Sequence, residues 1–412
     1  MADRLAVWLY GDVVALTEEE RGRIRLTYTD AALERYPLGF PLLSLSLPLT
    51  AERYTDGVVR PFLDGLLPEG APRRAVADDL NLKASDTFGL IQGLGRDCAG
   101  AVVIQSAGDP PPPLPTTAAA EQLTDADLAA LVANLRTAPL GIADRVRISL
   151  AGVQEKLVLT RMPDGSWGRP VDGTPSTHIL KPELPEYPQT VENEAFCMRL
   201  AKHLQLDVAS VETTSVDGRR LIVVERFDRI VRGDGSVERL HQQDFCQATG
   251  IPPVKKYQED GGPSLRRVAA ILQAVSTDEA LDVLLRAVIL NVLIGNGDAH
   301  GKNFSLLHEP SGTLRLAPLY DLLSTMHYGD DRLAMYIDDV RRTSRVTADR
   351  IINEAVAWGI VRRRAAEVVD DLLDRTPAAA LSAQEDTDSV PTEIPQIIDR
   401  QFRQLRAGSK RA

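Results

Sequence analysis

The sequence predicts an α+β protein in which a β-rich region precedes an all-helical region. Before about residue 245 the patterns are those of strands: LSLSLPL at 43–49 alternates with a period of two, and 221–224 is a short apolar run. Beyond that point apolar residues recur at helical spacing, and the segment 281–293 leaves little polar surface. The change of period indicates two regions of different architecture.

Length and composition indicate how many domains the chain has and which binding partners are disfavoured. The 412 residues are enough for two or three domains, and 47 Lys+Arg against 58 Asp+Glu give a net charge of −11. This charge disfavours non-specific binding of nucleic acid or of a membrane by the whole surface. The three cysteines are far apart and form no CxxC pair, which favours a reducing compartment. Without a signal peptide or a long apolar run, we expect a cytoplasmic protein that does not associate with membranes.

The first part of the chain is expected to contain short strands and turns. Strands are predicted at 5–9, 43–49 and 101–104, with glycine-rich turns over 89–100. Five prolines between positions 110 and 115 predict an extended spacer, because each proline ring fixes φ and removes a backbone donor. A recognition peptide for a proline-binding domain is the alternative.

Strand and helix signals then alternate before the helical region begins. Strands are predicted at 157–159, 178–181 and 221–224. The expected helix N-caps are Thr124, Thr190, Ser264, Thr277 and Thr347, and a terminal helix is expected over 394–405. We therefore divide the chain into an N-terminal subdomain (1–109), a Pro-rich linker (110–122), a β-rich lobe (123–245) and an all-helical lobe (246–412).

The polar loop 294–303, IGNGDAHGKN, follows the most apolar helix pattern. A turn needs its glycines, but it does not need an Asp, a His, a Lys and an Asn together. The spacing from Asp298 to Asn303 matches the catalytic loop of protein kinases, in which the Asp accepts a hydroxyl proton and the Asn holds Mg²⁺. Asp321 lies in an apolar stretch just after a strand predicted at 314–316, and a metal ligand or a helix N-cap would explain it there.

Other candidate residues precede this loop in the order that kinases use. Lys181 ends an apolar strand, as a phosphate-binding lysine does, and Glu192 or Glu194 in the next helix is a candidate partner for it. Asp228 follows the strand where a kinase joins its lobes. The segment 149–156 lies between strands and has small residues that suit a phosphate loop, although its single glycine matches neither standard phosphate-loop pattern.

Several longer stretches resemble the HipA family of bacterial toxin kinases: SLAGVQEKL (149–157), HILKP (178–182), ENEAFCMRLA (192–201), VERFDR (224–229), DFCQATG (244–250), KYQEDGGP (256–263), GDAHGKNFSLL (297–307) and LYDLLS (319–324). PLLSLSLPL (41–49), FLDGLLPEG (62–70) and GRDCAGAVVI (95–104) resemble the family's N-terminal subdomain. The loop reads DAHGKN where the family has D-G-H-A-K-N, so every polar residue is kept. The resemblance implies a two-lobed, protein-kinase-like fold related to the phosphoinositide kinases.

The resemblance also implies roles for individual residues. Asp298 would be the catalytic base, Asn303 and Asp321 would hold Mg²⁺, and Ser149 would be autophosphorylated. The residues implied to bind ATP are Ala151, Gly152, Val153, Gln154, Glu155, Lys156, Lys181, Glu225, Arg226, Phe227, His300, Gly301, Lys302, Asn303, Tyr320 and Asp321.

The implied biology is that of a serine/threonine-protein kinase acting as the toxin of a type II toxin–antitoxin pair. The family resemblance implies a HipB-like helix-turn-helix antitoxin dimer, which would carry the kinase to operator DNA. It also implies a translation factor as the target, of the kind of glutamyl-tRNA synthetase, whose phosphorylation would arrest growth. A small-molecule or lipid kinase on the same fold, or a catalytically weak co-repressor, are the alternatives.

Overall fold

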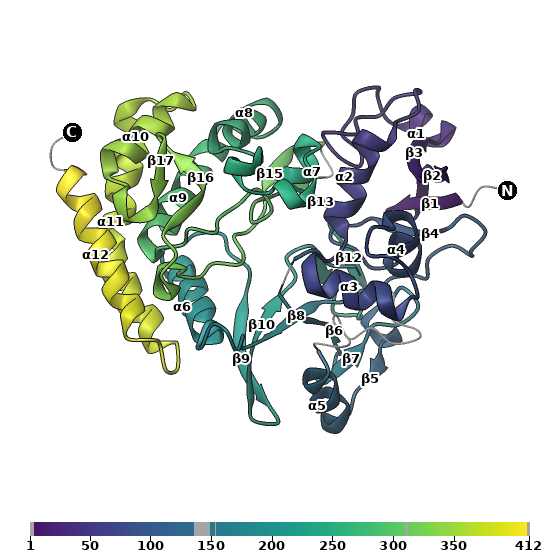
Figure 1. Ribbon diagram of the computed structural model, residues 1–412, viewed down its shortest axis with the longest axis horizontal. Coiled ribbons are helices and arrows are strands. Elements are labelled where there is room, and N and C mark those ends of the chain that lie inside the picture. The colour runs from purple at the N-terminus through teal and green to yellow at the C-terminus, as the bar shows by residue number, and fades with distance from the viewer. Residues whose placement is uncertain (1–3, 136–148, 153, 310–311, 410–412) are drawn as a thin grey trace. The chain divides into compact units, whose positions relative to one another are not determined.

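The structure is a computed structural model, which describes residues 4–135, 149–152, 154–309 and 312–409 (Figure 1). The chain divides into two compact units that are interleaved along the sequence. The first unit comprises Met1–Pro182, Ser215–Arg219 and Asp228–Val254, and the second comprises Glu183–Thr214, Arg220–Phe227 and Lys255–Ala412. The predicted boundaries at 109, 122 and 245 stay a prediction.

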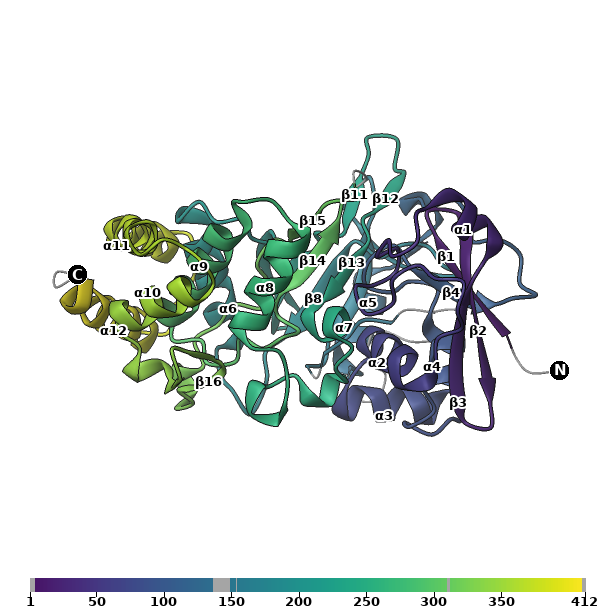
Figure 2. The same ribbon diagram turned by 90° about the horizontal axis from the view of Figure 1, so that it is seen from above.

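The first unit begins with an antiparallel sheet in the order β3-β2-β1-β4, which Figure 2 shows edge-on. Leu5, Val7 and Leu9 alternate along β1 and are buried, as a strand with one face in a core requires. They join an apolar core that extends to Leu150 and Val158. The elements of this part are β1 (Arg4–Leu9), β2 (Asp12–Glu20), β3 (Arg23–Tyr28), α1 (Asp30–Arg35), α2 (Asp56–Leu66), α3 (Gly70–Asp79), α4 (Thr87–Leu94) and β4 (Val103–Ser106).

A second sheet in this unit runs in the order β5-β7-β6-β8. The antiparallel pair β6–β8 sets Leu157 opposite Leu180, and the expected cap Thr124 forms a capping box with Asp127. The elements are β5 (Glu121–Gln122), α5 (Asp125–Ala133), β6 (Leu157–Arg161), β7 (Trp167–Arg169), β8 (His178–Pro182), β11 (Arg229–Val231), β12 (Val237–Arg239), β13 (Gln242–Asp244) and α7 (Phe245–Thr249).

The second unit is mostly helical but includes β-hairpins. The expectation of an all-helical region after residue 246 is wrong in this respect, because β14 pairs with β15 and β16 pairs with β17. The elements are α6 (Thr190–His203), β9 (Val211–Val216), β10 (Arg219–Glu225), α8 (Leu265–Val275), α9 (Ala280–Ile294), β14 (Ser305–His308), β15 (Leu314–Leu316), β16 (Arg332–Ile337), β17 (Val340–Arg342), α10 (Ala348–Ala357), α11 (Arg362–Glu385) and α12 (Glu393–Ser409). Two of these elements cross the unit boundary: β9 ends, and β10 begins, in the first unit.

Two local predictions in the N-terminal region are wrong. The alternating segment 43–49 is no strand: it holds a single bridge between Ser44 and Leu47, and the Ser44 hydroxyl donates to the Gln243 side chain at 2.8 Å. Polar partners distant in sequence thus override the alternating pattern. The glycine-rich turns expected over 89–100 are partly replaced by α4, which begins after Asp86 because its carboxylate accepts a hydrogen bond from the Gly89 N–H.

A buried ionic cluster connects distant segments of the first unit. The Arg229 guanidinium is fully buried and lies 2.9 Å from the Asp97 carboxylate and 3.1 Å from the Asp228 carboxylate. It also donates to the carbonyls of Cys98 and Gly100, and Asp97 accepts from Ser176. Charges removed from water this completely need such partners, because desolvation of an ion costs several kcal/mol.

No helix in the part of the chain that the structure describes is both long and apolar enough to span a bilayer.

Replacement of Asp97 by Ala should destabilise the protein by about 3–5 kcal/mol, because it leaves the buried Arg229 charge without its closest carboxylate. Urea unfolding of the full chain measures this loss. Asp109→Ala is the matched control: Asp109 pairs with Arg96 at 2.8 Å, but both side chains are about a third exposed. That change should cost only about 0–1 kcal/mol. Equal losses in the two variants would contradict the prediction.

Candidate active site

The loop 295–303 begins where α9 ends. Eleven of the fifteen residues of α9 are buried, so the helix is fixed within the core of the second unit. Gly295 ends it in the left-handed conformation with a φ of +67°, which glycine adopts at little cost. The polar loop therefore starts from a rigid support at a defined angle.

Backbone hydrogen bonds hold the middle of the loop. The Gly297 N–H donates to the Thr325 hydroxyl at 2.8 Å, and the Gly297 carbonyl accepts from the Ala334 N–H at 2.7 Å. A Cβ atom at Gly297 would lie 2.2 Å from the Arg332 carbonyl oxygen, so only glycine fits there. This close approach fixes the residue that precedes Asp298.

Asn303 and Asp321 lie side by side, 18 positions apart in sequence. The Asn303 amide donates to the Asp321 carboxylate at 2.9 Å, and its carbonyl oxygen accepts from the His300 N–H at 3.2 Å. Asp321 has a φ of +58°, an unusual conformation for a residue other than glycine. The Asn193 side chain from α6 holds the following segment through two hydrogen bonds to the Ser324 backbone, of 2.8 and 3.1 Å.

Asp298 is oriented by its neighbours and remains exposed to solvent. Its N–H donates to the Asn296 side chain at 3.0 Å. Burial by the surrounding protein raises the pKa of Asp298 to about 6, while a hydrogen bond from Tyr257 and the charge of Lys256 lower it, and Asp321 and Asp330 raise it. Because water still reaches the residue, solvent weakens this upward shift of the pKa.

The segment around Tyr257 packs on the same loop. The rings of Tyr257 and His300 meet edge to face with centroids 5.4 Å apart, and the Gly301 N–H donates to the Lys256 carbonyl at 3.3 Å. Burial and the neighbouring Lys256 charge hold the pKa of His300 well below its usual value, so its imidazole is neutral at pH 7. His300 can thus act in hydrogen bonding but not as a cation.

An aromatic pair lies beside the loop's end. The rings of Phe227 and Tyr320 are stacked with centroids 5.4 Å apart. The Tyr320 hydroxyl donates to the Lys302 carbonyl at 2.6 Å and lies 2.7 Å from the Ser305 hydroxyl. Flat apolar faces of this kind suit a planar ring such as a nucleobase.

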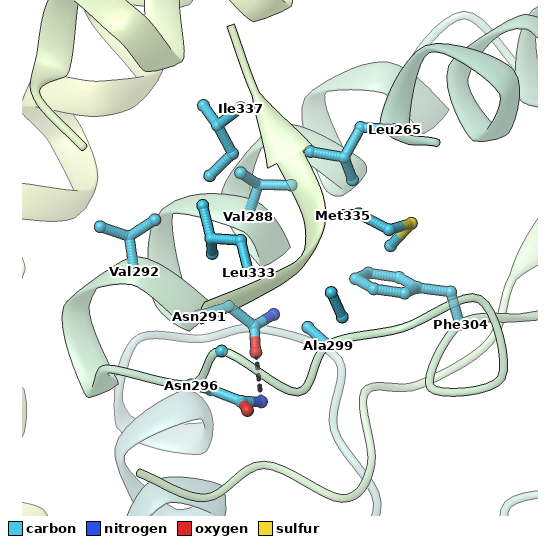
Figure 3. A pocket seen from close by; sticks show the side chains of 12 residues that line it. Leu265, Val288, Asn291, Val292, Asn296, Ala299, Phe304, Leu333, Met335 and Ile337 are labelled. Atoms are coloured by element: carbon cyan, nitrogen blue, oxygen red, sulfur yellow. Dashed lines mark hydrogen bonds between the residues drawn. The ribbon is translucent and has the colours of Figure 1, made fainter. Parts of the chain in front are cut away.

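Behind the loop lies a small, mostly apolar pocket, seen from close by in Figure 3. Ala299 lines the pocket, whereas the preceding Asp298 is exposed. The Asn296 amide donates to the Asn291 side chain at 2.7 Å on the loop side of the pocket. Its lining is completed by Leu265, Val288, Val292, Gly297, Phe304, Leu333, Ala334, Met335 and Ile337.

The remaining predicted site residues of the N-terminal half lie in the first unit. The Ser149 hydroxyl is fully buried and donates to the Leu66 carbonyl at 2.7 Å. The Gly152 carbonyl accepts from the Glu69 N–H at 3.0 Å, and the Lys156 ammonium donates to the Ala151 carbonyl at 2.6 Å. The loop is thereby attached to the turn between α2 and α3.

Within each unit, the structure brings together several predicted residues. The second unit brings together Asp298, His300, Gly301, Lys302, Asn303, Tyr320, Asp321 and Phe227. Glu225 and Arg226 belong to the same unit. Ser149, Ala151, Gly152, Gln154, Glu155, Lys156 and Lys181 belong to the first unit. Val153 lies outside the described residues.

Glu192, one of the two proposed partners of Lys181, pairs with Arg220 at 3.0 Å. The pairing of Lys181 with Glu192 or Glu194 stays a prediction. Tyr257, Thr325 and Asn193 are contacts of the site that sequence reasoning missed. The only signal for Tyr257 was its place in the KYQEDGGP stretch, and no local pattern marks Thr325.

The side chains present fit a kinase's cofactors. Asn303 and Asp321 offer amide and carboxylate oxygens, which Mg²⁺ prefers. Among the described residues no cluster of three or more His, Cys, Asp or Glu is arranged to hold a metal. An ion at Asn303 and Asp321 would therefore take its other ligands from phosphate and water, as Mg²⁺ usually does.

Comparisons with known proteins agree with this geometry. Residues 5–105 match the HipA N-terminal domain, and residues 148–380 match the HipA-like C-terminal domain. The chain is 42% identical over 399 residues to protein Y4mE of Sinorhizobium fredii, a kinase by name, with 93% of this chain and 92% of that protein covered. It is 35% identical over 324 residues to the serine/threonine-protein kinase toxin HipA of Shewanella oneidensis, covering 73% of this chain and 71% of that one.

A solved structure shares the fold. The complex of HipA, HipB and operator DNA from Shewanella oneidensis MR-1 matches with a TM-score of 0.82 at 27% identity, over 99% of this chain and 97% of that one. The expectation of a mixed helix and sheet fold of the HipA type is confirmed. With both family domains matched and the polar loop after α9 intact, this chain belongs to the HipA family of kinases.

Proposed function

We propose that this protein transfers the γ-phosphate of ATP to a serine or threonine hydroxyl of a protein substrate, as the toxin of a type II toxin–antitoxin pair. The observation that carries this proposal is the polar loop after α9, in which Asp298 is exposed and Asn303 is hydrogen-bonded to Asp321 at 2.9 Å. One carboxylate faces solvent, where a hydroxyl can reach it, and two oxygen-bearing side chains lie together for a metal.

Each side chain has a role in this proposal. Asp298 accepts the proton of the attacking hydroxyl, and its raised pKa makes it a stronger base than an ordinary aspartate. Asn303 and Asp321 hold Mg²⁺, which neutralises charge on the phosphates when bound. The phosphates are bound by Lys181 and the loop 151–156.

In this proposal, the segment 225–227 and residues near the polar loop make the other contacts with the nucleotide. The Phe227–Tyr320 stack offers a face for adenine. Within the loop, His300, Gly301 and Lys302 contact the nucleotide. The neutral imidazole of His300 can donate or accept a hydrogen bond there without adding charge.

Replacing Asp298 by Ala should lower the rate of phosphate transfer by about 10²–10⁴-fold, because the proton acceptor is lost. Purified full-length protein, labelled ATP, Mg²⁺ and a lysate as substrate source provide the assay. Asp399→Ala is the control, since Asp399 lies on α12 and pairs with the exposed Arg403. Equal transfer by wild type and the Asp298 variant would refute the assignment, as would label that appears only in small molecules or lipids.

We further propose that autophosphorylation of Ser149 inactivates the kinase. The hydroxyl is fully buried and donates to the Leu66 carbonyl at 2.7 Å. A phosphate at this position adds about 1.5 to 2 negative charges at pH 7 and cannot donate to that carbonyl. Burial of such a charge is unfavourable, so the modified residue must leave its place and take the nucleotide loop with it.

Incubation with ATP should therefore place phosphate on Ser149, as detected by mass spectrometry, and the modified protein should bind ATP at least tenfold more weakly in calorimetry. Ser149→Ala removes the acceptor and should retain ATP binding. Ser166 is a suitable internal control, since its hydroxyl is bonded to Asp164 in an exposed turn. A fully phosphorylated protein that binds ATP as tightly as the unmodified one would exclude the mechanism.

For partners, we propose a HipB-like antitoxin dimer that carries the kinase to operator DNA. The support is the fold shared with a HipA that was solved together with HipB and operator DNA. The net charge of −11 disfavours direct binding of DNA by most of the surface, so the partner would supply the main DNA contacts. The ATP requirement and three buried free thiols suit the cytoplasm.

Co-expression with a helix-turn-helix protein encoded beside this chain should yield a stable complex in size-exclusion chromatography. Binding of operator DNA in a mobility-shift assay should require that partner, because the kinase alone is acidic. An unrelated helix-turn-helix protein serves as the control. Separate elution of the two proteins, or DNA binding by the kinase alone, would argue against the proposal.

For the target, we propose a translation factor of the kind of glutamyl-tRNA synthetase, whose phosphorylation arrests growth. Comparison of phosphorylated proteins in cells that express wild type and Asp298→Ala identifies the target directly.

A further inference from the structure

The C-terminal helix α12 packs along α9, α10 and α11, as both views show (Figures 1 and 2). Its buried apolar face is formed by Ile394, Ile397, Ile398 and Leu405. Gln401 interrupts this face and is only 1% exposed. A polar side chain in such a place needs hydrogen-bond partners, because burial without them is costly.

The partners of Gln401 are two backbone carbonyls from different elements. Its side-chain amide donates to the Val292 carbonyl at 3.3 Å and to the Thr343 carbonyl at 3.1 Å. Val292 lies in the last turn of α9, where carbonyls lack partners within the helix. The same carbonyl accepts the Gly295 N–H at 3.1 Å, so Gln401 completes the end of the helix that leads into the catalytic loop.

A second residue of α12, Ile397, contacts Gly295, the first residue of the loop. A Cβ atom at Gly295 would lie 3.0 Å from the Ile397 side chain and 3.0 Å from the Met326 sulfur. The Gly295 carbonyl in turn accepts the Met326 N–H at 3.0 Å. The left-handed turn at Gly295 is thus enclosed by α12 on one side and the segment 325–328 on another.

The position of Asp298 depends on this end of α9. Asn291 in α9 accepts a hydrogen bond from the Asn296 side chain at 2.7 Å, and Asn296 accepts one from the Asp298 N–H at 3.0 Å. A displacement of the last turn of α9 would therefore be transmitted to Asp298 by these two hydrogen bonds.

We infer that Gln401 on α12 is a positioning residue, which holds the end of α9 and the loop after it and thereby Asp298. The inference rests on the proposed function of Asp298. The match to the HipA-like C-terminal domain ends at residue 380, whereas α12 begins at Glu393. The family match alone therefore does not point to this helix.

Simple packing is the competing explanation, and the side chain itself argues against it. The Gln401 side-chain oxygen is buried and has no hydrogen-bond partner among the residues that the structure describes. An unsatisfied buried acceptor is unfavourable, so methionine, which has a similar shape and no such acceptor, would serve packing better. What glutamine contributes here, and methionine cannot, is the side-chain amide donor.

The test is Gln401→Met in the full-length protein, with Gln404→Met as the matched control on the same helix. Gln404 donates to the Val346 carbonyl and does not contact α9 through that bond. Gln401→Met should lower kcat about tenfold, because the hydrogen bond to the Val292 carbonyl at the end of α9 is lost, with KM for ATP and Tm nearly unchanged. The control should leave kcat within about twofold of wild type.

Hydrogen exchange supplies a readout that does not depend on activity. Amides of the segment 295–303 should exchange at least fivefold faster in Gln401→Met than in wild type, and no faster in Gln404→Met. Should Gln401→Met fail to fold, Ile397→Val tests the contact with Gly295 and should give a smaller increase in the same segment.

Unchanged exchange and unchanged kcat in folded Gln401→Met would overturn the inference. A loss of Tm with kcat per folded molecule retained would also overturn it, in favour of packing. Failure of the proposed function is recognised separately: wild type would then show no transfer that depends on Asp298, while the exchange experiment still decides whether Gln401 holds the loop.

Discussion

Burial of the Arg229 guanidinium is the constraint on which the first unit depends. A cation with no exposed surface has to be surrounded by acceptors, and they come from Asp97, Asp228 and the carbonyls of residues 98 and 100. The same Asp97 accepts the Ser149 N–H at its backbone carbonyl, at 2.9 Å. Ser149, at the start of the proposed nucleotide loop, is therefore attached to one of the two carboxylate residues that neutralise the buried charge.

The N-terminal region also contacts the segment that follows residue 149. Its apolar core includes Leu150 and Val158, and the turn between α2 and α3 pairs with Gly152. The backbone of this region thus supports the segment 149–152, which we propose belongs to the nucleotide loop. Matching of the two family domains as separate segments, 5–105 and 148–380, does not reveal this connection.

What the sequence predicts best is chemistry encoded within a few adjacent residues. The spacing from Asp298 to Asn303 and the apolar helix before it can be recognised in the sequence, because the loop and the helix are adjacent along the chain. The strand expected over 43–49 failed because Ser44 bonds to Gln243, about 200 positions away in sequence. Of the hairpin strands in the second unit, the one at 314–316 is predicted and is β15, whereas β17, with three residues, is too short for a periodic pattern. Contacts such as Tyr257 with Asp298, or Gln401 with Val292, join distant segments and have no local signature.

The left-handed backbone of Asp321 has a consequence for the variation that the chain can tolerate. An L-residue in this region carries a penalty on the order of 1–2 kcal/mol that glycine avoids. Selection for thermal stability alone would therefore enrich glycine at position 321 and discard the carboxylate bonded to Asn303. Retention of aspartate in active variants, and its replacement in inactive ones, would mark position 321 as one where activity is maintained at the expense of stability.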